Sequence, residues 1–412
     1  MPLWHDCFEG LDLKENLFYN KNMDTLDRIL QTCREMDVEA DGDASPLPEP
    51  LARPAPTPYN PGCRDQLPVG TAALPNGQQI TLLKTLQNTA CEKDCYYCAF
   101  RAGRDFQRDR FTPDEMARAF MDLYRGGVVQ GLFISSSISG GGMRTQDKLL
   151  DTAVILRQRM GFRGYLHLKL MPGAERDQVL RAMQLADRVS INLEAPNTNR
   201  LQNLAPHKIF MEELLQPMRW VEDIRRSLPG RQGWKGRWPS LTTQFVAGGA
   251  GESDLELLST TAWLHREVNL ARAYFSRFRP VSNTPLENQP ATHPLREHRL
   301  YQASFLLRDY GFDLEDLPFA LDGSLPLHRD PKLAWAMANL AECPVEINLA
   351  SRRDLLRVPG IGPKCADAIL NARLLEPIHT LGQLRALGVA SGRASPFILL
   401  DGRQPDQQMR LF

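Results

Sequence analysis

Short apolar runs rich in β-branched residues alternate with amphipathic segments between residues 79 and 280. Each amphipathic segment begins at a polar residue that suits a helix N-cap, as in TPDEMARAFMDLY and TQDKLLDTAVILRQRM. The apolar runs are residues 80–86, 128–136, 165–171, 187–195, 241–248 and 271–278. Six such units predict an α/β fold of parallel strands with crossover helices, as a partial barrel or an open sheet. In either arrangement, chemistry belongs at the carboxyl ends of the strands.

The pattern divides the chain into four predicted parts. Residues 1–68 hold a short helix, MDTLDRILQTCREM, and a linker punctuated by prolines. Met23 opens this helix, so either Met1 or Met23 is the biological start. Residues 69–282 form the α/β core, residues 283–347 a helical extension, and residues 348–412 a separate small all-α unit.

Composition is that of an ordinary globular protein. Of the 412 residues, 42% are hydrophobic and 24% are charged, and the formal net charge is zero. No apolar run approaches the roughly 18 residues needed to cross a bilayer, and the N-terminus does not resemble a signal peptide, so we expect a cytoplasmic protein. Zero net charge excludes a protein-wide field that attracts nucleic acid, so any such binding depends on local patches.

Three of the eight cysteines, Cys91, Cys95 and Cys98, lie close together in the sequence CEKDCYYC. The others are Cys7, Cys33, Cys63, Cys343 and Cys365. A reducing compartment disfavours disulfides, which leaves a metal as the reason for the cluster. Structural zinc sites and structural iron–sulfur clusters normally have four protein ligands. A four-iron cluster on three cysteines leaves one iron open to a small molecule, which favours catalysis; the alternative is a zinc knuckle completed by Cys63 or a histidine.

The spacing C-x-x-x-C-x-x-C, with the aromatic Tyr97 before the last cysteine, resembles the signature of the radical S-adenosylmethionine (SAM) superfamily. The resemblance implies a partial (β/α)6 barrel whose first loop binds a [4Fe-4S] cluster through Cys91, Cys95 and Cys98. SAM would chelate the fourth iron, and its reductive cleavage would release a 5′-deoxyadenosyl radical that abstracts hydrogen from the substrate. The protein would bind, orient and exclude water, and no catalytic side chain is assigned.

Other positions match the superfamily unevenly. After the second strand, members carry a Gly-Gly-Glu-like turn that contacts the methionine amino group, whereas residues 140–142 are three glycines without a glutamate. Backbone carbonyls or Ser139 are the candidates for this contact, which stays unassigned. Asn192 and Glu194 fall on one face where members contact the ribose, although a structural hydrogen bond is an alternative role for Glu194. The candidate cofactor-binding residues are Tyr97, Ser139, Gly140, Gly141, Gly142, Asn192 and Glu194.

The sequence LLRVPGIGPKCADAIL resembles a helix-hairpin-helix element, which implies a DNA-binding domain. Val358, Gly360, Gly362 and Lys364 are its candidate DNA-binding residues, because glycines expose backbone N–H groups at a helix start where a phosphate can bind. A weaker second copy follows in LGQLRALGVASGRASPFI. Residues 348–412 hold nine basic and five acidic residues, a net charge of +4. The alternative is a hairpin that docks a protein.

Two further readings are disfavoured by the residues present. DNA glycosylases with this hairpin have an aspartate downstream, where this chain has His379, and four cluster cysteines, so we do not expect a glycosylase. Arginines and tryptophans interleave over residues 219–238. We interpret this stretch as the solvated face of a helix and a loop, rather than as a surface that stacks on unpaired bases near the barrel mouth.

Together the two motifs resemble the family of radical SAM proteins assigned to DNA modification or repair, whose members are associated with a uracil-DNA glycosylase-like protein. The resemblance implies repair or modification of a nucleotide in DNA, with an electron donor such as flavodoxin or ferredoxin. One alternative is a radical SAM enzyme that modifies RNA or tRNA. Another is a non-catalytic iron–sulfur protein that binds DNA as a redox sensor.

Overall fold

The computed structural model describes residues 28–29, 69–73 and 79–405. Residues 28 and 29 are helical, and the rest of the predicted N-terminal helix, the proline-rich linker and the choice between Met1 and Met23 lie outside the described residues. The chain divides into two compact units. The first comprises Met1–Glu252 with Leu264–Thr292, and the second Ser253–Trp263 with His293–Phe412.

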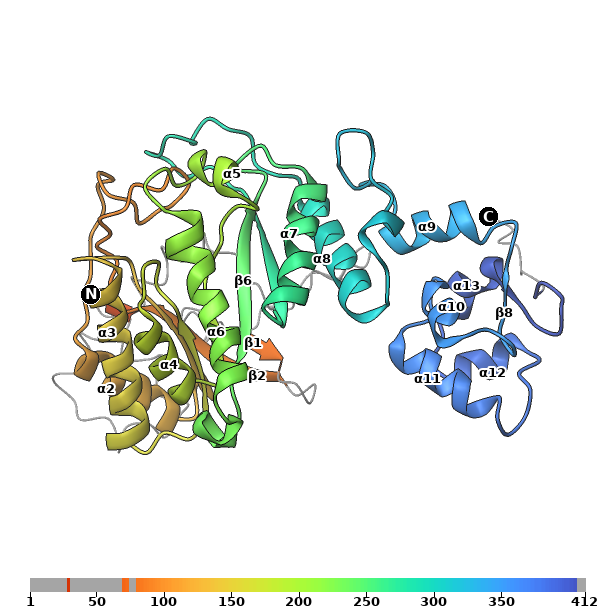
Figure 1. The fold of residues 1–412 in the computed structure, drawn as a ribbon, viewed down its shortest axis with the longest axis horizontal. Coiled ribbons are helices and arrows are strands. Elements are labelled where there is room, and N and C mark those ends of the chain that lie inside the picture. The colour runs from red at the N-terminus through yellow and green to blue at the C-terminus, as the bar shows by residue number, and fades with distance from the viewer. Residues whose placement is uncertain (1–27, 30–68, 74–78, 406–412) are drawn as a thin grey trace, which may run out of the picture. The chain divides into compact units, whose positions relative to one another are not determined.

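The first unit is built on a seven-stranded sheet whose strands follow one another in chain order (Figure 1). Its strands are β1 (Val69–Ala73), β2 (Gln79–Leu86), β3 (Gly131–Ser135), β4 (Tyr165–Lys169), β5 (Arg188–Ser190), β6 (Ser240–Ala247) and β7 (Arg272–Arg277). Strands β2 to β7 are parallel, and β1 pairs antiparallel with β2. The six predicted strands and their parallel order are confirmed, and the sheet stays open between β1 and β7, as a partial barrel requires.

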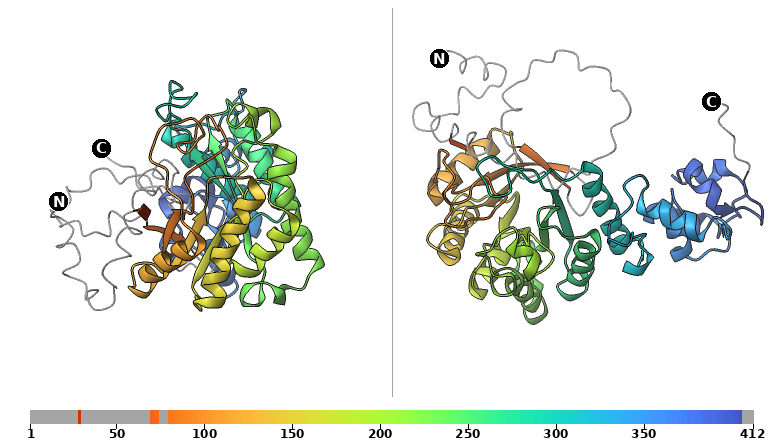
Figure 2. Two further views of the ribbon diagram at one scale, coloured as in Figure 1. Left: turned by 90° about the vertical axis from the view of Figure 1, so that its left-hand side faces the viewer. Right: turned by 90° about the horizontal axis from the view of Figure 1, so that it is seen from above.

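The crossover helices pack in succession along one face of the sheet (Figure 2). They are α2 (Pro113–Arg125), α3 (Gly142–Val154), α4 (Arg176–Leu185) and α6 (Gln216–Ser227), with π-helical turns at Ile155–Arg159 and Phe210–Leu215. The short helix α5 (Thr198–Gln202) follows β5, and α7 (Asp254–Glu267), which is divided between the two units, connects β6 to β7. Helix α2 begins with a capping box, in which Thr112 and Glu115 satisfy each other's backbone N–H groups. None of the helices in the described part of the chain is long and apolar enough to span a membrane.

The two faces of the sheet differ in chemistry because side chains alternate along each strand. Leu83 on β2, Leu132 on β3 and Leu166 on β4 are fully buried on the face that the helices cover. Gln87 lies four positions after Leu83, so its side chain points to the same face. There it accepts a hydrogen bond from the Thr152 hydroxyl of α3 at 3.0 Å. The opposite face, named the inner face below, carries polar side chains in its central rows.

The second unit is mostly helical. It contains α8 (Pro294–Asp309), α9 (Pro331–Asn339), α10 (Arg352–Arg357), α11 (Pro363–Ala372), α12 (Leu381–Ala386) and α13 (Ser391–Ala394). The prediction of an all-α unit is wrong in one respect, because β8 (Val345–Glu346) and β9 (Ile398–Leu399) pair as a two-stranded parallel sheet. Its buried core includes Ala336 and Leu340 from α9 and the residue after it, together with the apolar residues of α10 to α13.

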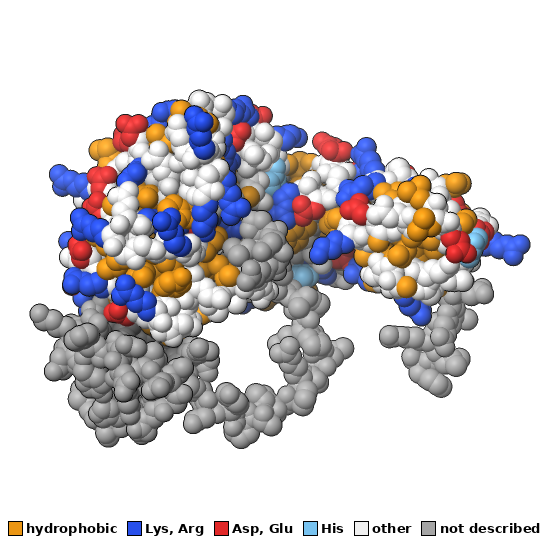
Figure 3. All heavy atoms as spheres, turned by 90° about the horizontal axis from the view of Figure 1, so that it is seen from below, with side chains coloured by type: hydrophobic (Ala, Val, Ile, Leu, Met, Phe, Trp, Pro, Cys, Tyr) orange, Lys and Arg blue, Asp and Glu red, His pale blue; other side chains and the backbone are white. Residues whose placement is uncertain are grey.

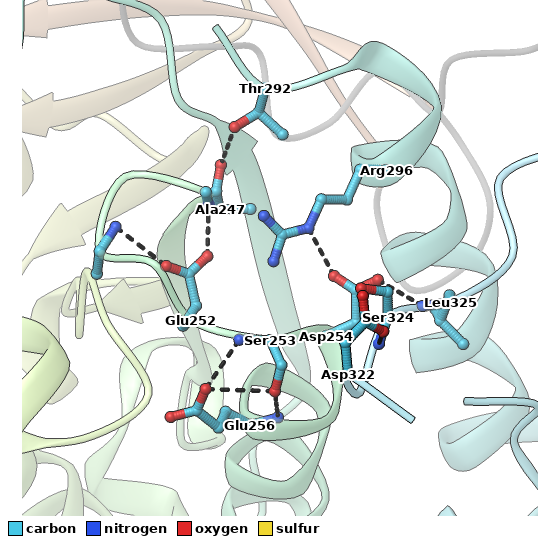
Figure 4. A network of polar contacts seen from close by, with 12 residues as sticks. Ala247, Glu252, Ser253, Asp254, Glu256, Thr292, Arg296, Asp322, Ser324 and Leu325 are labelled. Carbon is cyan, nitrogen blue, oxygen red and sulfur yellow. Dashed lines mark hydrogen bonds and ion pairs between the residues drawn. The ribbon is translucent and has the colours of Figure 1, made fainter. Parts of the chain in front are cut away.

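A buried carboxylate ties together the first residues of α7 and the start of α8 within this unit (Figure 4). Asp254 is 1% exposed; it accepts hydrogen bonds from Arg296 Nε at 2.7 Å and from the Leu325 backbone N–H at 2.8 Å. Both carboxylate oxygens are therefore satisfied, as a buried charge requires.

Candidate active site

The three clustered cysteines lie in the long loop that connects β2 to α2, at the carboxyl end of the parallel sheet. Cys95 is buried, Cys91 and Cys98 are partly buried, and none of the three is in a disulfide. The loop is closed at its base by an antiparallel bridge between Asn88 and Arg110. The predicted position of the three cysteines at a strand end is therefore confirmed.

Glu92, next to Cys91, holds one side of the loop against the glycine turn that follows β3. Its carboxylate accepts a hydrogen bond from the Gly140 N–H at 2.8 Å and one from the Gly141 N–H at 3.2 Å. Gly140 and Gly141 have φ angles of 76° and 89°, in the region that favours glycine, so the turn can direct successive N–H groups at one carboxylate. The turn itself contains no glutamate, and in the structure the carboxylate that contacts it comes from Glu92 of the cysteine loop.

The other side of the loop is held by the segment after α5. The Tyr96 N–H donates to the Leu204 carbonyl at 2.7 Å, and Lys93 Nζ donates to the His207 carbonyl at 3.0 Å. His207 Nδ1 and Asp94 Oδ1 lie 2.8 Å apart. The loop is thus fixed from two directions while its thiols are left unbonded to one another.

A buried ion pair lies beside the loop. Lys208 Nζ and Glu194 Oε1 are 3.0 Å apart, with side chains 10% and 6% exposed. Glu194 has a φ of 65°, which is uncommon for a residue with a side chain, and its Oε2 is buried without a hydrogen-bond partner among the described residues. Backbone strain and an unsatisfied buried oxygen each cost free energy, and their coincidence at one residue favours a functional role.

The charges around this pair shift the pKa values of nearby groups. Burial opposes the charge on Lys208, but Cys95 and Glu194 outweigh burial and raise its pKa. Burial also raises the pKa of the Cys95 thiol, against the opposing effect of Lys208. Burial raises the pKa of Tyr97 well above its usual range, and Glu194 adds to the increase. Lys208, Glu194, Tyr97 and Cys95 therefore form one electrostatically coupled group.

The remaining predicted residues lie at the same edge of the sheet. The Asn192 side chain accepts a hydrogen bond from Lys169 at the end of β4. Ser139 Oγ accepts one from Arg110 at 3.1 Å. Ser139 thus follows β3 and Asn192 follows β5, both at the carboxyl ends of the strands, and both already have protein partners.

The glycine-rich turn after β6 is held by an internal carboxylate within the first unit (Figure 4). Glu252, 5% exposed, accepts from the Gly248 N–H and, at 3.0 Å, from the Ala250 N–H. Thr292 Oγ1 donates to the Ala247 carbonyl at 2.9 Å. The N–H groups of Gly248 and Ala250 are therefore used for folding, and any cofactor contact would come from the exposed surface of the turn at Gly251.

Two observations fit a [4Fe-4S] cluster with SAM at this edge. The cationic Lys208 beside Cys95 is suited to thiolates, and the unpartnered Oε2 of Glu194 is suited to a hydroxyl donor. Within the described residues, no three His, Cys, Asp or Glu side chains are already grouped as a site for a single metal ion. Cys63, the alternative fourth ligand for zinc, lies outside the described residues.

In the second unit, α10 and α11 flank the predicted hairpin turn. Gly360 has a φ of 89°, and a Cβ there would lie 2.6 Å from the Ala390 carbonyl oxygen, so only glycine fits. Gly362 is the N-cap of α11 and provides no side-chain hydrogen bond to its first N–H groups. Lys364 is exposed, whereas Val358 is fully buried. Val358 thus positions the turn from the core, and its side chain is not available to DNA.

The positive charge predicted for residues 348–412 is partly neutralised inside the second unit. Residues 293–347 hold five basic and nine acidic residues. Arg357 pairs with Asp316 at 2.7 Å, and Arg353 lies 3.4 Å from Asp313. Any electrostatic attraction to DNA therefore depends on the side chains around the hairpin turn, not on the charge of the whole unit.

The stretch of arginines and tryptophans at residues 219–238 lies away from the cysteine loop. The Trp234 ring centroid is 3.9 Å from Arg157 Cζ, and Lys235 pairs at 3.1 Å with Asp187, the residue before β5. The stretch is α6 followed by a loop at the amino ends of the strands. A base-stacking surface near the barrel mouth is therefore excluded for Trp234.

Comparison with known proteins leaves the function open. No family model and no curated protein matches the chain. Methylornithine synthase PylB is similar over 55% of this chain and 61% of its own, with 15% identity and a TM-score of 0.44. The [FeFe]-hydrogenase maturase HydG is similar over 55% and 49%, with 12% identity and a TM-score of 0.43. The radical SAM methyltransferase TsrM from Kitasatospora setae is similar over 53% and 39%, with 13% identity and a TM-score of 0.37.

The chain therefore spans less than two thirds of the length of each of these proteins. Similarity at this level assigns no reaction to it. Its chemistry has to be argued from its own residues.

Proposed function

We propose that the chain is a radical SAM enzyme that repairs or modifies a nucleotide in DNA. The observation that carries the first half of this proposal is the strained, buried Glu194, which Lys208 holds beside the three-cysteine loop at the carboxyl end of a parallel sheet. When bound, the cluster would supply the electron for reductive cleavage of SAM to a 5′-deoxyadenosyl radical. Cys91, Cys95 and Cys98 would hold it.

The protein's own residues have separate tasks in this proposal. Glu194 Oε2 offers an acceptor for a ribose hydroxyl, and its other oxygen keeps Lys208 in place. Lys208 offsets the negative charge of the thiolates in a site with little water. Glu92 fixes the cysteine loop to the turn at Gly140 and Gly141, which sets the distance between the two walls of the site.

The test of cofactor chemistry is anaerobic reconstitution of the full chain. We expect about four irons per chain and formation of 5′-deoxyadenosine from SAM under reducing conditions. Cys95→Ala should lose both, whereas Cys343→Ala, which removes an exposed thiol of the second unit, should lose neither. One tightly bound zinc and no iron would show that the assignment is wrong.

DNA is supported as the substrate by the hairpin turn of the second unit. Gly362 leaves the first N–H groups of α11 without a side-chain cap, and the exposed Lys364 adds a positive charge. Phosphate contacts of this kind fix position without reading sequence, so the target nucleotide would be selected elsewhere. A base inside a duplex cannot be reached, so the target would be flipped out or already unpaired.

The test of DNA as substrate uses a point variant of the full chain. Lys364→Gln should weaken DNA binding at every sequence and remove the acceleration of 5′-deoxyadenosine formation by DNA, while slow DNA-independent cleavage persists. Truncation before Asn348 is less informative, because it would expose Ala336 and Leu340 of the second core. The alternative outcome is that a deuterium-labelled structured RNA accelerates SAM cleavage and transfers deuterium to 5′-deoxyadenosine, while no DNA does. The substrate would then be RNA or tRNA in place of DNA.

Absence of 5′-deoxyadenosine with every nucleic acid, in a protein that holds iron and binds DNA, would favour the redox sensor. Flavodoxin or ferredoxin is proposed as the electron donor, and a uracil-DNA glycosylase-like protein as a partner. Formation of 5′-deoxyadenosine with flavodoxin or ferredoxin in place of a chemical reductant tests the electron donor. Co-purification of the chain with the uracil-DNA glycosylase-like protein tests the proposed partner.

A further inference from the structure

Three leucines of the second unit are almost fully exposed. Leu349 and Leu374 are each 83% exposed, and Leu375 is 92% exposed. A single exposed leucine on a protein surface is ordinary, whereas several on neighbouring segments mark an interaction site. Hydrophobic side chains gather on one face of the second unit, at the right of Figure 3, among scattered charged side chains. These leucines therefore have a role other than the packing of their own chain.

Hydrogen bonds from an arginine hold the segments that carry these leucines next to each other. Arg373, which precedes Leu374, donates to the Ile347 carbonyl at 2.8 Å and to the Ala350 carbonyl at 2.7 Å. These two carbonyls lie on either side of Leu349 in the sequence. The segment of Leu349 is thus fixed beside the residues that follow α11.

A second pair of hydrogen bonds fixes the same segments. The Asn348 side chain donates to the Ile378 carbonyl at 3.0 Å and accepts from the Ile378 N–H at 2.8 Å. Ile378 is buried in the core of the second unit, so the exposed segments are anchored to that core. Leu349, Leu374 and Leu375 are named the leucine surface below.

A cavity of about 410 Å³ opens beside Leu349 within the second unit. Its walls include the apolar side chains of Trp335, Leu340 and Val345, together with Leu349 itself. A volume of this size is within the range of ligand-binding sites. Because Leu349 belongs both to the cavity and to the leucine surface, an apolar group bound over the leucines can also enter the cavity.

Carboxylates surround this apolar region. Glu346 and Asp354 line the cavity, and Glu376 follows Leu375 directly. Within the described part of the chain, Glu346 and Asp354 accept hydrogen bonds from backbone N–H and hydroxyl groups and form no ion pair. Their partners are neutral, so the negative charge of both side chains is not cancelled.

The neighbouring arginines offset little of this charge. The arginines of α10 are all paired with aspartates, Arg352 with Asp367 at 2.7 Å, Arg353 with Asp313 at 3.4 Å and Arg357 with Asp316 at 2.7 Å. Arg373 donates to backbone carbonyls and has no carboxylate partner among the described residues. One unpaired cation is therefore outnumbered by the carboxylates of Glu346, Asp354 and Glu376, which leaves a local excess of negative charge.

This combination of charge and apolar surface distinguishes between possible occupants. A second copy of the chain, related by a two-fold axis, would bring the same carboxylates of both copies together at a cost in free energy. A partner with apolar side chains flanked by lysine or arginine would instead bury the leucines and pair its cations with the carboxylates. We infer that the leucine surface and its cavity dock a basic amphipathic segment of a partner protein.

The leucine surface and the hairpin turn lie at opposite ends of α11. This helix has 10 residues and is therefore about 15 Å long. Lys364 lies in its first turn, whereas Leu374 lies two residues after its end. A partner on the leucine surface therefore does not need the hairpin turn, and the inference is independent of the DNA binding proposed above.

The experiment measures the binding of three labelled synthetic peptides to the full reconstituted chain by fluorescence anisotropy. The first is an amphipathic helix of about 15 residues with leucines on one face and lysines on the other. The second has glutamates in place of the lysines, and the third has the composition of the first in an order that forms no apolar face. The first should bind at least about tenfold more tightly than either of the others, because it alone combines an apolar face with positive charge.

Variants assign the binding to the leucine surface. Leu349→Gln and Leu375→Gln should each weaken binding of the lysine peptide by about tenfold. Glu376→Gln should reduce the preference for the lysine peptide over the glutamate peptide by about threefold. Leu321→Gln is the matched control, because Leu321 is fully exposed in a turn that contacts Leu255 of α7, and it should not change binding. Circular dichroism and melting temperature check that each variant is folded.

Cys343 reports whether the peptide covers the cavity. This residue is exposed and lines the cavity, so its thiol is open to N-ethylmaleimide. Labelling of Cys343, followed by mass spectrometry of the digested chain, should slow by about tenfold when about nine tenths of the chain has bound the lysine peptide. Labelling of Cys365 in α11 is the internal control and should not change.

Several results would overturn the inference. Equal affinities for the three peptides would show that the surface does not select a basic amphipathic segment. Unchanged binding in folded Leu349→Gln and Leu375→Gln, or unchanged labelling of Cys343, would place the peptide elsewhere. A dimer in sedimentation that Leu375→Gln abolishes would show that a second copy occupies the surface. Lys364→Gln should leave peptide binding unchanged, so a failure to bind DNA refutes the proposed function alone, and a failure to bind the lysine peptide refutes this inference alone.

Discussion

Lys332 of α9 offers a test of how the hairpin turn is held. Its Nζ donates a hydrogen bond to the Ile361 carbonyl at 2.6 Å and lies 4.6 Å from the centroid of the Tyr310 ring. Burial, with a smaller contribution from the nearby Arg393, lowers the pKa of Lys332 to about 7, against the opposing effect of Asp330. The free energy of unfolding of this unit should therefore depend on pH through one lysine.

The direction of this pH dependence follows from whether the folded or the unfolded chain binds more protons. The unfolded chain keeps the Lys332 proton up to its usual pKa of 10.5, whereas the folded chain releases it above about 7. Between these values the unfolded state binds more protons, so stability rises with pH, and below about pH 7 the folded state carries the full cost of a buried ammonium. At about 1.4 kcal/mol per pKa unit, the full shift corresponds to roughly 5 kcal/mol as an upper bound.

Lys332→Met removes this cost together with one hydrogen bond, which is worth about 1 kcal/mol. At pH 6 to 7 the variant should be more stable than the wild type by a few kcal/mol, and the difference should shrink as the pH approaches 9. The stability difference is measured by urea unfolding at pH 6, 7.5 and 9. Brief proteolysis that cleaves only the unfolded second unit reports the unfolded fraction. Lys364→Met, which removes an exposed lysine of the same hairpin, is the control. A stability difference between Lys332→Met and the wild type that is constant across this range would refute the reasoning.

Three further substitutions test the turn and the buried pair. Gly360→Ala should destabilise the second unit by about 2 kcal/mol or more, because the left-handed backbone is strained and the new Cβ meets Ala390, whereas Gly392→Ala, which has open space around it, should be nearly neutral in the same unfolding assay. Glu194→Gln and Lys208→Met should each cost roughly 3–5 kcal/mol of stability, and the double variant less than their sum, because each single change leaves a buried group without its partner. Additive losses would mean that the two residues are not coupled.

The strands were predictable where their pattern was strong. The six parallel strands show continuous or alternating apolar positions over five or more residues, and hydrogen bonding then places them in chain order. β1, with the sequence VGTAA, has almost no apolar periodicity and exists because it pairs with the edge of β2. β8 and β9 are two residues each, which is too short for any pattern.

The candidate site was predictable in its thiols and less so in their surroundings. Spacing alone identifies Cys91, Cys95 and Cys98, because it is local in sequence. Glu92 contacts a turn 48 residues away, and Lys208 lies in a short polar stretch with no motif, so neither could be assigned before the chain was folded. The two roles predicted for Glu194, a ribose contact and a structural hydrogen bond, are compatible. Its Oε1 accepts from Lys208, and its Oε2 has no partner among the described residues.

The basic residues of the inner face are visible in the sequences of the strands. Parallel strands covered on both faces by apolar layers read as continuous hydrophobic runs. Here ITLLKTL and YLHLKLM interrupt those runs with Lys84, His167 and Lys169 on the inner face, whereas the two arginines of ARAYFSRF lie on opposite faces. Basic residues at inner-face positions predict that this face meets polar groups instead of an apolar layer. The alternation thus describes the chemistry of the two sheet faces as well as the presence of strands, because both follow from the same period of two.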